Sequence, residues 1–199
     1  MVEEFKMVIC GVGGQGILTI SDVISIAAQK KGWHVLGSEV HGMAQKGGSV
    51  ITNLKIGMKL NSPTIPIGSA EILMGLEQNE TLRYIPYLRP GGVVITSTTV
   101  LFPIEWKKNK KAADIAREKI VENLSKFNAK IYRIDAEKLA IEAGLALAQN
   151  SVLLGALSQI DVFPLKEEEL REALKERVPS KYLEPNLKAF ELGIKAIKE

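Results

Sequence analysis

The sequence predicts an α/β domain built as a three-layer sandwich, with helices on both faces of a mostly parallel, mixed sheet. Three observations support this fold class. Short apolar runs alternate with longer segments of helical periodicity along most of the chain. The first apolar run leads directly into a glycine-rich loop and then a helix, as in Rossmann-like βα units. The second half of the chain is rich in charge and poor in glycine, since only 3 of the 17 glycines follow residue 100, which is typical of amphipathic helices.

The first half of the chain predicts five strands and two helices. Residues 5–10 are almost uniformly apolar, which is typical of a strand buried on both faces. Residues 50–56 alternate in polarity, which predicts a strand with one buried face and a possible antiparallel edge of the sheet. The other expected elements are helices over 17–31 and near 77–88, and strands over 33–38, 72–76 and 93–96.

The second half predicts mainly helices. A helix over 112–127 precedes a strand over 130–134, and Asp135 is placed to cap a long helical region that reaches about residue 160. Residues 166–178 carry acids at their start and bases at their end, which matches the helix dipole, and the tail after them is also helical. No linker or internal repeat interrupts the pattern, so we expect a single domain over residues 1–199.

Composition excludes several classes of protein. A net charge of +3 is too small for a surface that neutralises many nucleic-acid phosphates. The lone cysteine, Cys10, excludes an internal disulfide, a four-cysteine iron–sulfur cluster and a zinc ribbon. No stretch of about 18 uninterrupted apolar residues occurs, and residues 1–4 (MVEE) lack the order of a signal peptide. We therefore expect a cytoplasmic protein that holds no metal and binds neither nucleic acid nor membranes.

The first candidate site is the loop over residues 11–16, which has the pattern G-x-G-x-x-G between a strand and a helix. Backbone N–H groups and the positive end of a helix would face an anion there, with no side chain in the way. Glu39 lies 23 residues beyond Gly16, near the position of a ribose-binding acid. The alternative is that the glycines only let strand and helix pack closely. The candidate cofactor-binding residues are Gly11, Gly13, Gly14, Gln15, Gly16 and Glu39.

The second candidate site is the polar, glycine-rich run over residues 38–50 (SEVHGMAQKGGSV). It follows a predicted parallel strand, at the end of an α/β sheet where ligands gather. His41 and Lys46 are candidates for a supporting catalytic role, and Gln45 is a candidate for ligand contact. All three could instead belong to a subunit interface.

Taken together, residues 11–19 (GVGGQGILT) and the run over 38–50 resemble the gamma-type domain of 2-oxoacid:ferredoxin oxidoreductases. Within that family they are most similar to the small, beta subunit of indolepyruvate ferredoxin oxidoreductases. The resemblance continues through 61–63 (NSP), 67–68, the turn at 90–92 (PGG) and 150–156 (NSVLLGA), together with Glu77 and Arg83, and covers about 150 residues. The chain departs from the family pattern at Thr96 and Ser97, where asparagine is frequent, and at Lys46, where arginine is common.

The resemblance implies a complex that converts an aryl 2-oxoacid, coenzyme A and oxidised ferredoxin to an arylacetyl-coenzyme A, carbon dioxide and reduced ferredoxin. Such chemistry needs thiamine diphosphate, magnesium and iron–sulfur clusters. This chain has neither a thiamine signature nor the cysteines for a cluster. The resemblance therefore places these cofactors in a larger alpha subunit and leaves this chain a cofactor-free partner that is inactive alone.

Three alternatives remain open. The chain could serve another 2-oxoacid, such as pyruvate or 2-oxoglutarate. It could be a freestanding NAD(P)-dependent dehydrogenase, although 199 residues leave little room for a substrate domain and no Tyr-x-x-x-Lys pair occurs. It could also be an adaptor that only binds a nucleotide.

Overall fold

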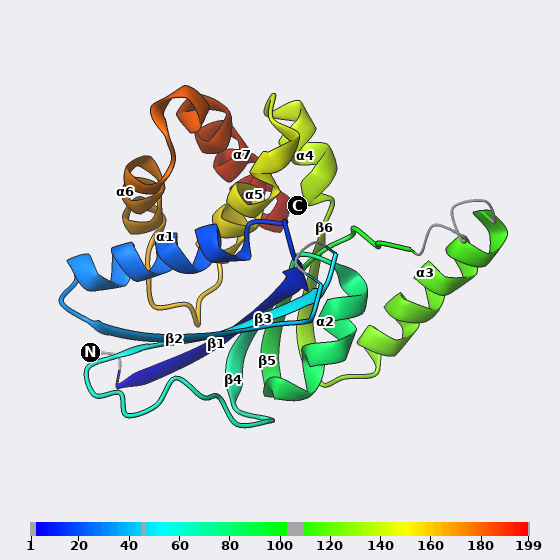
Figure 1. Cartoon of the computed structure of the whole chain (residues 1–199), viewed down its shortest axis with the longest axis horizontal. Helices are drawn as coiled ribbons and strands as arrows, with labels where there is room; N and C mark the ends of the chain where they lie inside the picture. Colours follow the sequence, from blue (N-terminus) through cyan, green and yellow to red (C-terminus); the bar gives the residue numbers. More distant parts are fainter. Residues whose placement is uncertain (1–2, 45–46, 103–109, 199) are drawn as a thin grey trace.

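The computed structural model describes residues 3–44, 47–102 and 110–198. These residues form a six-stranded sheet in the order β2-β3-β1-β4-β5-β6, with helices on both faces (Figure 1). The strands are β1 (Glu4–Val12), β2 (His34–His41), β3 (Ser49–Gly57), β4 (Ala70–Gly75), β5 (Leu88–Ser97) and β6 (Ala129–Ile134). β3 is antiparallel to both of its neighbours, whereas the pairs β1–β4, β4–β5 and β5–β6 are parallel. The predicted three-layer, mostly parallel fold is confirmed.

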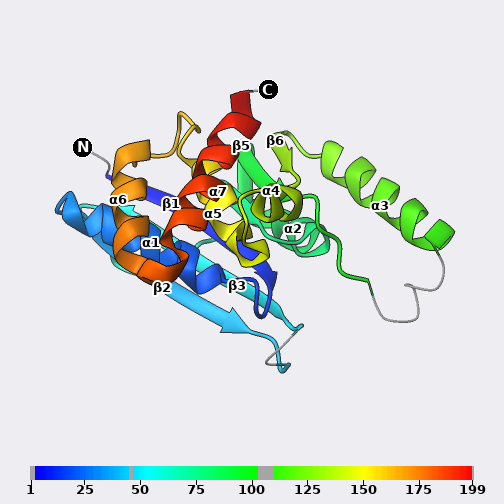
Figure 2. The ribbon, with the colours of Figure 1, turned by 90° about the horizontal axis from the view of Figure 1, so that it is seen from above.

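Two layers of helices cover the sheet. One face carries α1 (Ile17–Lys30), α4 (Ala136–Glu142), α5 (Gln149–Leu157), α6 (Glu167–Arg177) and α7 (Ser180–Lys198). The other face carries α2 (Gln78–Tyr84), the short 3-10 helix Ile85–Tyr87 and α3 (Lys110–Ser125). Figure 2 shows the first layer lying across the sheet and α3 extending away from the body of the molecule.

The uninterrupted apolar sequence of β1 is explained by burial on both faces of the sheet. Phe5, Met7 and Ile9 pack into the core under α1 and α5, and Val8 and Cys10 pack into the second core on the opposite face. Successive side chains point to opposite faces of a strand, so a strand with helices on both sides must be apolar throughout.

The position of β3 corrects one expectation. Its alternating polarity suggested an edge strand, but β3 lies between β2 and β1, and β2 is at the edge. The polar residues of β3 are accommodated inside the sheet: Lys55 pairs with Glu4 at 2.9 Å, and the Asn53 amide donates to Ser38 at 3.2 Å. Ile51 and Lys55, on the face that was expected to be exposed, are only 6% and 8% exposed. The alternation therefore marked neither an exposed face nor an edge strand.

The helical region after β6 is also different from the prediction. Asp135 does cap a helix, because its side chain accepts a hydrogen bond from the Lys138 backbone N–H at 3.1 Å. That helix, α4, ends at Glu142, and Gly144 has a φ of 96° that an α-helix does not allow. A short 3-10 helix (Ala146–Ala148) then leads into α5. The expected continuous helix is thus two helices separated by a turn.

α5 and α7 cross with their backbones in contact. A Cβ atom added to Gly155 would lie 1.9 Å from the Phe190 carbonyl oxygen, and one added to Gly193 would lie 1.9 Å from the Val152 carbonyl oxygen. The two glycines therefore set the distance between these helices. None of the helices in the described ranges combines the length and apolarity that crossing a membrane requires.

Candidate functional site

The candidate site lies at the carboxyl ends of β1 and β4. The chain passes from β1 into α1 on one face of the sheet and from β4 into α2 on the other. Such a reversal leaves a crevice outside the strand ends, where α/β proteins bind ligands. A hollow of about 740 Å³ occupies this place, and Val12, Gly47, Glu77, Glu80 and Arg83 are among its lining residues. We call it the switch-point crevice.

The glycine loop over residues 11–16 adjoins the crevice, which it lines through Val12. Gly13 N–H donates to the Gly48 carbonyl at 2.8 Å, so the loop is joined to the segment that enters β3. Gly14 and Gly16 have φ of 101° and 79°, and Gly16 is the N-cap of α1. A Cβ at Gly11 would lie 2.7 Å from the Gln15 side-chain oxygen. The glycines of the loop thus serve both backbone conformation and close packing.

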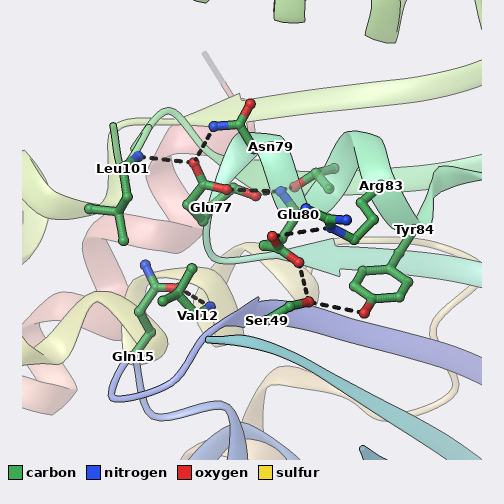
Figure 3. A network of polar contacts seen from close by, with 10 residues as sticks. Val12, Gln15, Ser49, Glu77, Asn79, Glu80, Arg83, Tyr84 and Leu101 are labelled. Carbon is green, nitrogen blue, oxygen red and sulfur yellow. Dashed lines mark hydrogen bonds and ion pairs between the residues drawn. The ribbon is translucent and has the colours of Figure 1, made fainter. Parts of the chain in front are cut away.

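Gln15 is engaged within the chain. Its side-chain oxygen accepts from the Val12 backbone N–H at 2.7 Å (Figure 3). Its amide nitrogen donates to the Leu76 carbonyl at 3.1 Å. The side chain therefore ties the glycine loop to the end of β4. Its predicted contact with a ligand is not needed to explain why a glutamine is present.

Glu39 and His41 lie beside the glycine loop, although β3 separates their strand from β1. A second hollow, of about 360 Å³, is lined by Gly13, Gly14, Gly16, Glu39 and His41, among others. The His41 Nε2 atom lies 2.9 Å from Glu39 Oε1, with 57% of the histidine side chain and 19% of the glutamate side chain exposed. The structure therefore brings together candidates from both predicted sites. Gln45 and Lys46 lie outside the described residues.

Two further residues of this hollow region were missed by sequence reasoning. Arg177, in the last turn of α6, lines the second hollow and donates through Nε to Asp22 at 2.8 Å. Asn150 is 8% exposed, and its amide nitrogen lies beside Gly16, since a Cβ there would be 2.7 Å away. Asn150 and Arg177 both line a third hollow of about 200 Å³ next to Thr19. No sequence signal places Arg177 near the glycine loop; its position follows only from the packing of α5 and α6 against α1. For Asn150 a signal existed, because it is the first residue of the NSVLLGA segment that carries part of the family resemblance.

Glu77 organises one wall of the switch-point crevice. It is the N-cap of α2, and its carboxylate accepts from the Glu80 backbone N–H at 2.8 Å, the Leu101 backbone N–H at 3.0 Å and the Asn79 amide at 3.2 Å (Figure 3). Burial raises the pKa of the Glu77 carboxyl, while the hydrogen bonds from these backbone groups oppose the rise. One buried side chain thus joins the ends of β4 and β5.

Glu80 connects this wall to β3. Ser49, the first residue of β3, donates to a Glu80 carboxylate oxygen and lies 3.0 Å from the Tyr84 hydroxyl. Arg83 Nε donates to the other carboxylate oxygen at 3.3 Å. Sequence reasoning missed Glu80. The signal that could have indicated it is the occurrence of two acids, Glu77 and Glu80, shortly after a buried strand.

Replacing Glu77 by alanine is expected to lower the free energy of unfolding by about 1–3 kcal/mol, because α2 loses its cap and the Leu101 N–H loses its acceptor. Chemical denaturation measures the effect. Glu118, exposed on α3, is a matched control whose replacement should change stability by less than about 0.5 kcal/mol. Equal effects at the two positions would contradict the role given to Glu77.

The parent protein and Glu77→Ala should also differ in how their free energy of unfolding depends on pH. Because the folded-state pKa of Glu77 is raised above its unfolded value, the proton-linked part of its contribution to stability is complete below the unfolded pKa and is lost as pH rises through the folded pKa. The hydrogen bonds that its carboxylate accepts are a separate contribution. The proton-linked part should be present in the parent protein and absent from Glu77→Ala when unfolding is followed across mildly acidic pH.

Replacing Gly14 by alanine is expected to cost roughly 1–2 kcal/mol, because its φ of 101° is unfavourable for a side chain although no atom lies within 4 Å of the added Cβ. Gly37, whose added Cβ would meet only ordinary contacts at 3.8 Å, is the matched control. Thermal unfolding compares the two variants. A Gly14→Ala protein as stable as Gly37→Ala would show that the loop relaxes without strain. Gly13 does not have a positive φ, so no comparable strain is expected for a substitution at that position.

The described residues offer no group of three or more His, Cys, Asp or Glu side chains that could hold a metal ion. Cys10 is fully buried, and desolvation raises the pKa of its thiol well above the usual range. The thiol is therefore an apolar filler of the second core rather than a ligand or nucleophile.

Comparison with known proteins decides the family. The model of the family described as "Pyruvate ferredoxin/flavodoxin oxidoreductase" matches residues 6–196. The chain belongs to this family. It is 43% identical over 200 residues to the indolepyruvate oxidoreductase subunits IorB of Thermococcus kodakarensis and of Pyrococcus horikoshii, covering 100% of this chain and 98% of each relative. It is 28% identical over 184 residues to the pyruvate/ketoisovalerate oxidoreductases common subunit gamma of Thermococcus kodakarensis, covering 91% of this chain and 90% of that one.

Solved structures share the fold. The gamma subunit of a keto/oxoacid ferredoxin oxidoreductase from Geobacter sulfurreducens matches with a TM-score of 0.74 and 22% identity, covering 98% of both chains. A 2-oxoglutarate:ferredoxin oxidoreductase from Magnetococcus marinus, solved with 2-oxoglutarate, coenzyme A and succinyl-CoA bound, matches with a TM-score of 0.73 and 20% identity. The match covers 100% of this chain and 32% of that one, so the same fold occurs there as part of a much longer chain.

Proposed function

We propose that residues 1–199 form one domain, which is the small subunit of an indolepyruvate:ferredoxin oxidoreductase. The observation that carries the proposal is the 43% identity to two indolepyruvate oxidoreductase subunits over nearly their whole length. Identity to the common gamma subunit for pyruvate and ketoisovalerate is only 28%. Aryl pyruvates are therefore favoured over smaller 2-oxoacids as substrates of the complex.

The side chains present support a division of labour within the complex. In this proposal thiamine diphosphate, magnesium and iron–sulfur clusters belong to a larger subunit. In support, the lone cysteine is buried, and the described part of the chain has no group of three or more His, Cys, Asp or Glu side chains that could hold a metal ion. In the larger subunit these cofactors would supply decarboxylation of the 2-oxoacid and one-electron transfer to ferredoxin. This chain would bind and orient substrates at the carboxyl edge of its sheet and act in the cytoplasm.

The second hollow suits an anionic part of coenzyme A, which is bound in the Magnetococcus marinus enzyme. The positive end of α1 faces it across Gly16, and no side chain obstructs the approach at Gly13 or Gly14. Arg177, whose Nε donates to Asp22, adds a guanidinium group to the lining. Helix N-termini and arginine are common partners of phosphate groups. Asn150 adds an amide donor beside Gly16.

His41 and Glu39 form the polar end of this hollow. The contact between His41 Nε2 and Glu39 holds the imidazole in one orientation and leaves Nδ1 available to a ligand. In this proposal His41 stabilises charge that develops on the reacting acyl group, and Glu39 positions it. Lys46 and Gln45 stay sequence-based predictions for the same region.

Reconstitution tests the proposal. The purified chain alone should show no turnover and no flavin, thiamine or iron–sulfur absorbance. Mixed with the larger subunit, it should support ferredoxin reduction that depends on coenzyme A, with kcat/KM for indolepyruvate at least about tenfold above that for pyruvate or 2-oxoglutarate. Turnover by the isolated chain would disprove the division of labour, and a preference for pyruvate would disprove the substrate class.

The NAD(P)-dehydrogenase alternative loses support from the sheet order. A dinucleotide-binding fold places the second strand directly beside the first, so that its terminal acid reaches the ribose. Here β3 lies between β1 and β2, and the Glu39 carboxylate is already paired with His41.

A further inference from the structure

The free edge of β2 has the features of a pairing surface. β2 is the terminal strand of the sheet, and Figure 2 shows it along the outer side of the molecule. It pairs with β3 over all eight residues, His34–His41, without a bulge, and contains neither lysine nor proline. Edge strands that stay unpaired are usually short, bulged or marked by proline or charged side chains, especially lysine. The one acidic side chain of β2, Glu39, is 19% exposed and paired with His41.

The opposite edge of the same sheet is different. β6 carries two exposed basic residues, Lys130 and Arg133, on a strand of six residues. The Lys130 ammonium lies over the Tyr132 ring, 5.0 Å from its centroid. The β6 edge therefore carries exposed lysine and arginine side chains, whereas the β2 edge carries neither.

The β2–β3 hydrogen bonds show which backbone groups of β2 are free. Gly42 N–H donates to the Ser49 carbonyl at 2.8 Å, and this pair continues the β2–β3 register. Since bonded pairs alternate along an antiparallel ladder, the even-numbered residues of β2 bond to β3. The odd-numbered residues Val35, Gly37, Glu39 and His41 therefore point their N–H and C=O groups away from the sheet.

We propose that two copies of this chain pair through antiparallel β2 strands around a two-fold axis at Ser38, which joins their sheets into one continuous sheet. The outward-pointing N–H and C=O groups form hydrogen bonds between the two copies only in registers that place odd-numbered residues of one β2 opposite odd-numbered residues of the other. Centring on Ser38 places Leu36 opposite Val40 of the second copy and Glu39 opposite Gly37. Val40, now 60% exposed, gains an apolar neighbour, and no like charges face each other. Centring on Gly37 instead would place Leu36 opposite Ser38 and Val35 opposite Glu39.

The pairing goes beyond the proposed function and is compatible with it. A two-fold axis through antiparallel edge strands is perpendicular to the sheet, so the carboxyl edges of the two copies point in opposite directions. Each copy keeps its own switch-point crevice free for a larger subunit.

Sedimentation of the full chain from low to high micromolar concentration tests the proposal. The parent chain should dimerise, and Leu36→Glu or Val40→Lys should each weaken the dimer about tenfold or more, because each removes two symmetry-related pairs at once. An equimolar mixture of the two variants should regain much of the dimer, because the glutamate introduced in one copy then faces the lysine introduced in the other. Ile67→Lys, at a position 72% exposed in the loop after β3, is the control that should dimerise like the parent.

Disulfide trapping provides a readout that does not depend on the stability of these variants. Ser38→Cys should give a cross-linked dimer under mild oxidation, because directly opposite residues in a non-bonded pair have Cα atoms about 4.5 Å apart. Ile67→Cys should not cross-link, and Cys10 is buried. A monomeric parent chain, a dimer without the Ser38→Cys cross-link, or loss of larger-subunit binding as the sole effect of Val40→Lys would each overturn the proposal.

Discussion

Replacing His41 by alanine is expected to lower the saturated turnover of the assembled complex by about 10- to 1000-fold, which corresponds to about 1.4–4 kcal/mol of transition-state stabilisation. The physical reason is its place at the polar end of the hollow beside the glycine loop, with Nε2 held by Glu39 at 2.9 Å. Steady-state kinetics at saturating larger subunit measure kcat, and subunit affinity is measured on the same protein. Affinity should be unchanged.

His34 is the matched control, because it is an exposed histidine at the other end of the same strand. Its replacement by alanine should leave turnover within about twofold of the parent. If His41→Ala instead weakened assembly and kept a normal kcat at saturating partner, His41 would be an interface residue and the supporting catalytic role would be refuted.

Replacing Gly155 by alanine is expected to destabilise the chain by about 3 kcal/mol, because the new methyl group would overlap the Phe190 carbonyl and force α5 and α7 apart. For a domain of this size the melting temperature should fall by roughly 6–12 °C, which thermal unfolding measures. The sign is informative, because glycine-to-alanine changes inside a helix normally stabilise it by about 1 kcal/mol.

Gln149, the half-buried first residue of α5, provides the control for Gly155. Its change to alanine should alter stability by less than about 0.5 kcal/mol. A Gly155→Ala protein more stable than the parent would show that the two helix backbones are not in contact.

The sequence predicted helices, strands and caps well where neighbouring residues alone determine them. The apolar run in β1 reflects burial on both faces, and the cap at Asp135 reflects one hydrogen bond within a single turn. The glycine loop and its helix also follow from adjacent residues, as does the charge arrangement of α6. Both candidate sites directly follow a strand, and the structure brings residues of both to one hollow beside the glycine loop. Their functional roles stay predictions.

The sequence misjudged features that depend on distant residues. The turn at Gly144 is an exception, because its signal is local: the Gly144 and Leu145 N–H groups donate to the Ile141 and Ala140 carbonyls, which is the hydrogen-bond pattern of a glycine that ends a helix. It was missed because the flanking residues have helical periodicity. Glu77 was noted only through a resemblance, because its role depends on Leu101, which is 24 residues away. Arg177 was not singled out, because nothing near it in the chain indicates that α6 lies against α1.

By itself, the sequence determined the fold class, the glycine loop and the family, because each depends on the order of neighbouring residues. The tertiary structure alone decided that β3 lies between β1 and β2, that His41 and Glu39 share a hollow with the glycine loop, and that Asn150 and Arg177 adjoin it. Sequence patterns did not reveal these features because strand order and helix packing depend on the free energy of the whole chain rather than on neighbouring residues. Residues more than a hundred positions apart can therefore form one site without leaving any local pattern.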